Sequence, residues 1–283
     1  MSATTATPER IGFIGLGDQG GPMARAIAEA GHPLHAWARR PASLAILDGV
    51  PYTAHAGAAD LAAACDILCL CLPEDEDVRS VVLDGGLLEH MKPGSVLVNH
   101  GTGLPAFAGE LTRLCAAHDV HVLDAAVSGA RAGALAKTLT TMVGGDETQA
   151  KRCEGIFQSF STSVVYMGGA GSGQLAKLFN NALMMMNQRS IEEIIEVAQR
   201  VHLDLPRLLE VLGTGSATSA ALTSLNAAIT VDNAEHLTKL QLIDMQLFAD
   251  AVAPHHAQAD DVTARAVDGS HGLVALARAV APH

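Results

Sequence analysis

The sequence is short of positive charge and has no long apolar run, and both shortages exclude classes of protein. Its 283 residues include 18 Lys and Arg against 30 Asp and Glu, which gives a formal net charge of −12. No run of adjacent cations exceeds two residues, whereas proteins that bind nucleic acid cluster their cations. No apolar run reaches the roughly 18 to 20 residues of a membrane span, and Met1–Arg10 lacks the basic and apolar segments of a secretory signal. We therefore expect a cytoplasmic protein with no nucleic-acid or membrane partner.

Cysteine is also scarce, and no CxxC pair of the kind that binds zinc is present among Cys65, Cys69, Cys71, Cys115 and Cys153. Because their number is odd and they lie in apolar or helical stretches, we expect reduced thiols in the core. His118, His121 and Asp124 are evenly spaced, but they span a loop and a strand. We therefore expect no metal site.

Apolar residues, in contrast, make up 49% of the chain, and only 17% of residues are charged. This composition excludes a disordered or collagen-like chain, and the length indicates about two domains. In the first half, short apolar runs alternate with helical stretches such as 105–118 and 147–160. The alternation predicts an α/β fold whose N-terminal domain is a Rossmann-type, doubly wound parallel sheet with its ligand at the carboxyl ends of the strands. The expected strands are 11–14, 34–37, 67–72, 95–99, 120–124, 139–143 and 163–167.

The pattern changes after Met167, where four glycines fall within six residues and no convincing strand follows. Residues 172–202 have helical periodicity, which predicts one helix some 45 Å long at ~1.5 Å per residue. Shorter helices are expected at 206–212, 217–229, 234–253, 262–267 and 273–281. We therefore expect a sheet domain over 1–167 and an all-helical domain over 168–283, joined by the long helix.

A glycine-rich loop, Gly15-Leu16-Gly17-Asp18-Gln19-Gly20, lies between the first expected strand and a helix. In a GxGxxG loop the first glycine permits a tight turn, the second lets the backbone approach a pyrophosphate, and the third allows close packing of helix on strand. The N–H groups at the helix start then face the anion. The alternative is a flexible turn, which the strand before the loop and the helix after it disfavour. We expect all six residues to contact a dinucleotide, with the Asp18 carboxylate pointing away from the pyrophosphate or capping the helix.

Cofactor preference depends on the end of the second expected strand. Sites that prefer NAD place an Asp or Glu about twenty residues after the glycine loop, where it binds the ribose 2′-hydroxyl. This chain instead has Arg39 and Arg40 after Trp37, and two guanidinium groups complement a 2′-phosphate. We expect NADP(H) to be favoured over NAD(H). The alternative is that the two arginines only cover the surface.

Four separated motifs resemble those of the β-hydroxyacid dehydrogenase family, which includes 3-hydroxyisobutyrate dehydrogenase and is related to 6-phosphogluconate dehydrogenase. The glycine loop resembles the family's cofactor signature, with Gln19 where Met is usual. Residues 124–134, DAAVSGARAGA, resemble its substrate-binding stretch, with Ala126 for Pro and Ala130 for Gly. Residues 171–181, GSGQLAKLFNN, match the catalytic signature GxGxxxKxxxN, and 208–217 resemble a stretch of the helical domain.

The resemblance implies a cofactor domain followed by a helical domain, and a homodimer or homotetramer. It also implies cofactor contacts from three residues that follow the expected strands, which are Leu72, Pro73 and Thr102. The family's Lys-Asp pair of the later helices is reduced here to Ile243-Asp244, and its acidic C-terminal signature is hard to find in 269–274. The identity of the substrate therefore stays open.

Lys177 and Asn181 lie four residues apart in the long expected helix, so both side chains project from one face. Hydride addition to a carbonyl carbon builds negative charge on the oxygen, which an ammonium group stabilises and protonates. We expect Lys177 to be the general acid, or the general base in the reverse direction, with Asn181 orienting the lysine or the substrate oxygen. The alternative for Lys177 is an ordinary solvated helix cation.

The substrate acid group needs an anchor that fixes the carbonyl near the nicotinamide. The resemblance places Ser128 and Gly129 there, where a hydroxyl and backbone N–H groups can bind a carboxylate. Asn180 flanks the catalytic pair, and Arg131 is either a further substrate cation or a surface residue.

These features predict an NADP(H)-dependent oxidoreductase that interconverts a small β-hydroxy acid and its semialdehyde or keto acid. Two alternatives stay open. An imine reductase of related architecture usually has Asp or Tyr where this chain has Lys177. A non-catalytic dinucleotide-binding module has no need of Lys177 and Asn181.

Overall fold

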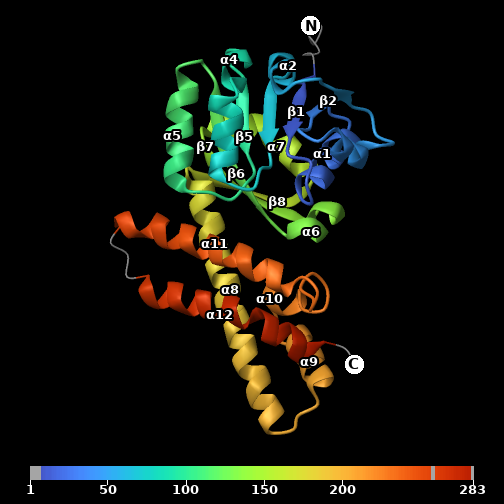
Figure 1. Cartoon of the computed structure of the whole chain (residues 1–283), viewed down its shortest axis with the longest axis vertical. Coiled ribbons are helices and arrows are strands. Elements are labelled where there is room, and N and C mark those ends of the chain that lie inside the picture. The colour runs from blue at the N-terminus through green and yellow to red at the C-terminus, as the bar shows by residue number, and fades with distance from the viewer. Residues whose placement is uncertain (1–7, 256–258, 282–283) are drawn as a thin grey trace, which may run out of the picture. The chain divides into compact units, whose positions relative to one another are not determined.

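The computed structural model describes residues 8–255 and 259–281. The contacts divide the chain into two compact units, Met1–Lys177 and Leu178–His283, whereas the sequence pattern suggested a division near residue 167. The sheet belongs to the first unit, and helices make up the described part of the second (Figure 1). Within the described ranges, no helix is both long and apolar enough to cross a bilayer.

The first unit is built on one sheet, in which the described residues form eight strands in the order β3-β2-β1-β4-β5-β6-β7-β8. The strands are β1 (Ile11–Ile14), β2 (Leu34–Trp37), β3 (Thr53–Ala54), β4 (Ile67–Leu70), β5 (Val96–Asn99), β6 (His121–Ser128), β7 (Leu139–Gly145) and β8 (Ser161–Gly168). The strand order reverses between β1 and β4, and sheets of this kind bind ligands beyond the carboxyl ends of the strands at such a point. The expected Rossmann-type sheet is confirmed.

Helices pack on both faces of this sheet. They are α1 (Gly20–Glu29), α2 (Ala58–Ala64), α3 (Asp75–Arg79), α4 (Leu87–His90), α5 (Pro105–Ala116), α6 (Ala130–Ala136), α7 (Glu147–Gln158), the 3-10 helix Pro41–Leu47 and the π-helical turn Ser80–Asp84. Successive side chains of a strand point to opposite faces, so β1 contributes to two cores. Phe13 is buried in one core with Ile27 and Phe157, and Ile14 is buried in the other with Leu61.

One pair of strands departs from the expected parallel sheet, because β6 and β7 are antiparallel. The connection between them is only residues 129–138, shorter than the dozen or so residues that a parallel crossover needs. Gly129, Ala130 and Lys137 have positive φ angles within it, which turns the chain back on itself. The expectation also missed β3, because two residues are too short to form an alternating pattern.

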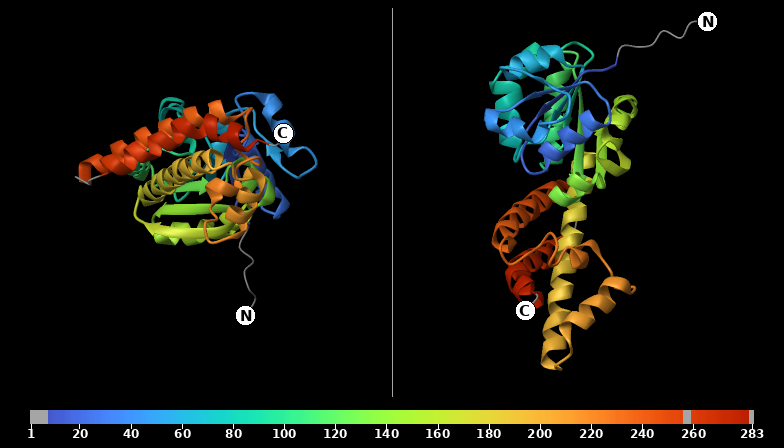
Figure 2. Two further views of the ribbon diagram at one scale, coloured as in Figure 1. Left: turned by 90° about the horizontal axis from the view of Figure 1, so that it is seen from below. Right: turned by 90° about the vertical axis from the view of Figure 1, so that its right-hand side faces the viewer.

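The second unit consists of helices in its described part. They are α8 (Ser172–Arg200), which begins in the first unit, α9 (Leu205–Thr214), α10 (Ala220–Thr223), α11 (Ala234–Val252), the 3-10 turn Ala253–His255 and α12 (Asp260–Val280). Figure 2 shows α11 and α12 side by side in both views. The long helix that the periodicity predicted over 172–202 is present as α8. The helix expected over 217–229 is reduced to α10.

The last helix is continuous, although the sequence predicted two helices separated by a Gly-containing stretch. A Cβ on Gly269 would overlap the carbonyl oxygen of Met185, and one on Gly272 would overlap the carboxylate of Glu192. Gly269 therefore lets the backbones of α12 and α8 come close together, and Gly272 leaves room for the Glu192 carboxylate. The packing offsets the cost of about 1 kcal/mol that a glycine brings to a helix interior.

All five cysteines are free thiols, four of them buried and Cys71 half-buried. Burial raises the pKa of Cys71 to about 12, so this thiol is protonated at neutral pH. Among the described residues, no group of three or more His, Cys, Asp or Glu side chains could hold a metal ion.

Candidate functional site

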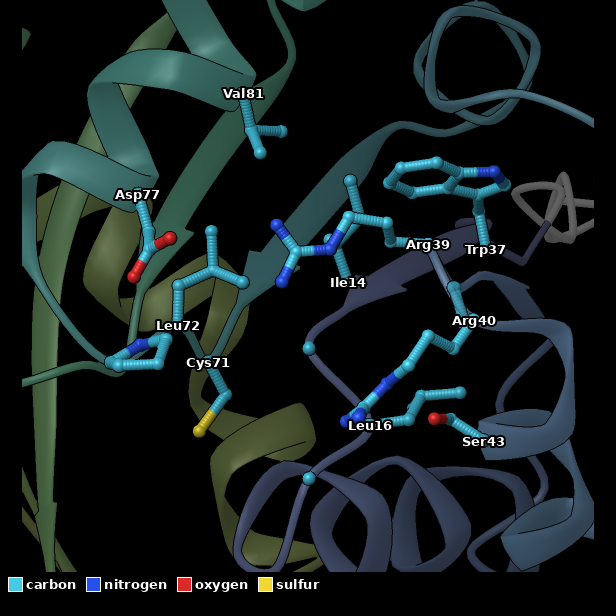
Figure 3. A pocket seen from close by; sticks show the side chains of 14 residues that line it. Ile14, Leu16, Trp37, Arg39, Arg40, Ser43, Cys71, Leu72, Asp77 and Val81 are labelled. Atoms are coloured by element: carbon cyan, nitrogen blue, oxygen red, sulfur yellow. The ribbon is translucent and has the colours of Figure 1, made fainter.

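A cavity of about 320 Å³ lies at the carboxyl ends of β1, β2 and β4 in the first unit (Figure 3). Among the residues that line it are seven of those predicted to bind a cofactor: Gly15, Leu16, Gly17, Arg39, Arg40, Leu72 and Pro73. Residues up to 58 positions apart in the chain thus meet at the point where the strand order reverses. The cavity also has lining residues that the sequence patterns did not single out, which are Ile14, Trp37, Ala38, Ser43, Cys71, Asp77 and Val81.

The glycine loop has the shape that a bound pyrophosphate requires. Gly15 has a φ of +97°, and a Cβ there would overlap the carbonyl oxygen of Cys71. A Cβ on Gly20 would overlap the carbonyl oxygen of Gly15, so α1 begins directly against the loop. A Cβ on Gly17 would meet nothing within 4 Å, which leaves its backbone open to a ligand. The first turn of α1 contains no acidic residue, so its positive dipole end is available to an anion. These residues fit a dinucleotide.

The two arginines after β2 reach the cavity from one side. Figure 3 shows the Arg39 guanidinium extending across the cavity toward the side of Leu72 and Asp77, while the Arg40 guanidinium lies beside Leu16 and Ser43. Arg40 directly precedes the 3-10 helix Pro41–Leu47, which contains Ser43. Both residues line the cavity, which therefore offers a cation and a hydroxyl, two groups that bind a phosphate monoester.

Arg131 lies against the glycine loop. Its Nη1 donates a hydrogen bond of 3.2 Å to the carbonyl oxygen of Asp18 and lies 3.6 Å from the Asp18 carboxylate. The Asp18 side chain is 95% exposed and that of Arg131 51% exposed, so solvent screens their attraction. The guanidinium nevertheless places a positive charge beside Asp18, the one acid of the glycine loop. Gln19 precedes α1 and makes no side-chain cap to it.

Ser128 and Gly129 lie where β6 ends and α6 begins. Ser128 is half-buried and Gly129 is exposed. Gly129 has a φ of +128°, and a Cβ there would meet the side chain of Leu139. Thr102 is half-buried in the loop between β5 and α5.

The next residue, Ala130, has a φ of +51°, in the left-handed region that favours glycine. We expect Ala130→Gly to raise the free energy of unfolding of the first unit by about 1 kcal/mol, because the side chain no longer opposes this backbone angle. Thermal unfolding followed by circular dichroism measures the change. Ala132→Gly, in the same helix and also exposed, is the control and should destabilise the protein. If Ala130→Gly destabilises it equally, Ala130 carries no such strain.

The catalytic signature lies on α8. Lys177, which is half-buried, is the last residue of the first unit, and Asn181 follows one turn later in the second. Asn181 is buried, with 6% of its surface exposed. Its Nδ2 donates a hydrogen bond of 2.8 Å to Asp244 Oδ2, and its Oδ1 accepts one of 3.1 Å from Asn180 Nδ2. Asp244, the acid that remains of the family's Lys-Asp pair, therefore fixes the orientation of the Asn181 amide.

Two family models match this chain. Residues 10–168 match the family model described as the NAD binding domain of 6-phosphogluconate dehydrogenase. Residues 171–268 match the one described as NAD-binding of NADP-dependent 3-hydroxyisobutyrate dehydrogenase.

Curated relatives and a solved structure point the same way. A probable 3-hydroxyisobutyrate dehydrogenase of Mycobacterium bovis is 33% identical over 71% of this chain and 68% of its own length. An NAD-dependent L-serine dehydrogenase of Pseudomonas aeruginosa is 31% identical over 76% of this chain and 72% of its own length. The structure of 3-hydroxyisobutyrate dehydrogenase from Mycobacterium tuberculosis, with L-serine, matches with a TM-score of 0.81 and 26% identity, covering 97% of this chain and 98% of that one.

Proposed function

Because the chain belongs to the β-hydroxyacid dehydrogenase family, we propose that it is an NADP(H)-dependent oxidoreductase that interconverts a small β-hydroxy acid and its semialdehyde or keto acid. The observation that carries the proposal is the pair Lys177 and Asn181, one turn apart on α8, with the Asn181 amide held by Asp244. A fixed amide beside an amine supplies the two groups that a carbonyl reduction requires, a proton donor and an orienting hydrogen bond.

The chain's own residues carry the proton transfer. The dinucleotide, when bound, supplies or accepts the hydride. The Lys177 ammonium group stabilises the negative charge that develops on the substrate oxygen and donates a proton from Nζ. In the oxidative direction the neutral amine accepts that proton. The Asn181 amide uses one of its two N–H groups for Asp244, and the other donates to the substrate oxygen.

The cofactor preference rests on Arg39 and Arg40. Both line the cavity, and their guanidinium groups bind the ribose 2′-phosphate of NADP(H), with the Ser43 hydroxyl as a further donor. Gly15 to Gly20, Leu72, Pro73 and Thr102 hold the remainder of the dinucleotide. The contact between Arg131 and Asp18 offsets the negative charge of Asp18 at the pyrophosphate.

Substrate binding is assigned to the end of β6 and to α8. The Ser128 hydroxyl and the Gly129 N–H bind the substrate carboxylate, and Asn180 is a further substrate contact. The L-serine in the M. tuberculosis structure is a small β-hydroxy acid, which supports this substrate class.

A carbonyl panel tests the proposal. Semialdehydes, keto acids and cyclic imines are each incubated with the protein and NADPH or NADH, and loss of the reduced cofactor is followed by absorbance. Turnover of a semialdehyde or keto acid, faster with NADPH, is the expected result. Turnover of cyclic imines alone would make the protein an imine reductase, and stoichiometric NADPH binding without any turnover would make it a binding module.

We also propose that the protein forms a homodimer or homotetramer. Large apolar side chains are more than half exposed on the second unit, among them Leu183, Ile194 and Val197 of α8 and Val211 of α9. Exposed apolar side chains of this size are typical of surfaces that a second subunit covers. Light scattering should give a mass that is two or four times 29.2 kDa.

A further inference from the structure

The side-chain amide of Gln174 binds the loop after β5 on both sides of Thr102. Its Nε2 donates a hydrogen bond of 2.7 Å to the carbonyl oxygen of Gly101, and its Oε1 accepts one of 2.9 Å from the N–H of Gly103. Gln174 is 1% exposed, so no solvent competes for these contacts. A single planar group therefore fixes the backbone before and after Thr102.

The backbone of Gln174 is itself fixed by Asp124 of β6. Asp124 Oδ2 accepts a hydrogen bond of 2.9 Å from the Gln174 N–H, and Oδ1 accepts one of 2.8 Å from the Gly171 N–H. A Cβ on Gly173 would overlap the carbonyl oxygen of Asp124, so the first turn of α8 lies directly against the strand. Burial raises the pKa of Asp124, and the backbone hydrogen bonds partly oppose this.

The same loop is bound from its other end. The N–H of Leu104 donates a hydrogen bond of 2.8 Å to Asp75 Oδ2, and Asp75 begins α3. The segment 101–104 is thus held by Asp75 of α3 and by the side-chain amide of Gln174 in α8. Lys177 follows Gln174 by three residues, nearly one helical turn.

We propose that Gln174 is a positioning residue that sets the place of the Thr102 loop relative to Lys177. The inference rests on the proposed function, in which Thr102 contacts the cofactor and Lys177 transfers the proton. A hydride donor and a proton donor must be held close to one productive geometry, and a misplacement of about 1 Å costs about 100-fold in rate. The Gln174 amide joins the backbone on both sides of Thr102 to the helical turn that precedes Lys177.

Three variants test the proposal. Gln174→Met removes both hydrogen bonds at similar volume. Gln174→Glu keeps the acceptor for Gly103, but an ionised carboxylate has no proton for the Gly101 oxygen. Gln188→Met is the matched control, because Gln188 is also a glutamine of α8 with 1% exposure, and its amide atoms have no hydrogen-bond partner among the described residues.

We expect Gln174→Met to lower kcat by about 10- to 100-fold while the Kd for NADPH changes less than about threefold. Gln188→Met should keep the wild-type kcat. Hydrogen exchange measured by mass spectrometry should show faster exchange at Gly103 in Gln174→Met than in the wild type or in Gln188→Met.

The pH profile of Gln174→Glu supplies a readout that a merely structural role would not move. A protonated carboxyl group both donates and accepts, as an amide does, so kcat relative to Gln174→Met should rise as pH falls through the pKa of the introduced carboxyl. Among the ionisable groups of this region are Asp124 of β6, which accepts from the Gln174 N–H, Asp75 of α3, which accepts from the Leu104 N–H, and Lys177 on α8 itself. All three are also present in Gln174→Met, whose profile therefore corrects for them.

Each failure has its own signature. If Gly103 exchanges equally fast in Gln174→Met and the wild type, the amide does not hold the loop and the proposal is wrong. If exchange rises but an active enzyme keeps its kcat, or if Gln174→Glu shows no recovery at low pH, the positioning role is wrong. If the wild type itself turns over no substrate, it is the proposed function that fails, and the hydrogen exchange still decides whether Gln174 holds the loop.

Discussion

Replacing Lys177 with alanine is expected to lower kcat for carbonyl reduction by about 1,000-fold, which is within the range of general acid catalysis. The variant keeps the glycine loop and both arginines of the cavity, so the Kd for NADPH should stay within about threefold of the wild-type value. The loss should therefore appear in single-turnover hydride transfer and not in cofactor titration by fluorescence. A residual rate is expected, because the contact that we propose between Asn181 and the substrate oxygen remains.

Lys151→Ala is the matched control for this experiment. Lys151 is an exposed lysine of α7 that pairs with Glu147, outside the cavity and outside α8. The Lys151→Ala variant should keep the wild-type kcat. Turnover of Lys177→Ala comparable to the wild type would remove Lys177 from the mechanism and leave it as an ordinary helix cation.

The double substitution Arg39→Ala/Arg40→Ala is expected to raise the KM for NADPH about 100-fold and to change that for NADH less than about threefold. Each charge-assisted hydrogen bond to the 2′-phosphate contributes about 1.5–3 kcal/mol, and 1.4 kcal/mol corresponds to tenfold in affinity. NADH lacks the 2′-phosphate. The informative measurement is therefore the ratio of the KM for NADPH to the KM for NADH.

The salt dependence of the same variant provides a second readout. Salt screens exposed charges, so added salt should raise the wild-type KM for NADPH and have less effect on the double variant. Arg113→Ala, which removes an exposed arginine of α5, should behave like the wild type. Equal losses with NADPH and NADH would show that the two arginines support the cavity but do not read the 2′-phosphate.

Local pattern in the sequence was enough to predict the Rossmann-type sheet, the glycine loop and the long helix. Each of these depends on residues close together in the chain, such as the spacing of Gly15, Gly17 and Gly20. The antiparallel pairing of β6 and β7 was missed, because apolar runs do not reveal strand direction. The antiparallel register of the two strands, with positive φ angles at Gly129, Ala130 and Lys137 between them, shows that the chain reverses there.

The parts of the site that sequence reasoning missed depend on contacts between distant residues. Asp77 and Val81 reach the cavity from α3 and the turn after it, and no periodicity connects them to Arg39. The contact between Arg131 and Asp18 joins residues 113 positions apart. The family's Lys-Asp pair draws attention to Asp244 in the sequence. Its hydrogen bond with Asn181 joins residues far apart in the chain, so only the fold shows it.

The boundary between the two units has a practical consequence. It falls between Lys177 and Leu178, inside the continuous helix α8, whereas proteases prefer exposed loop tips. Trypsin, which cuts after lysine, therefore meets a half-buried, helically bonded backbone at that bond. Limited digestion cannot release the dinucleotide-binding half as an intact fragment there, and expressing the halves separately would divide a helix that both of them need.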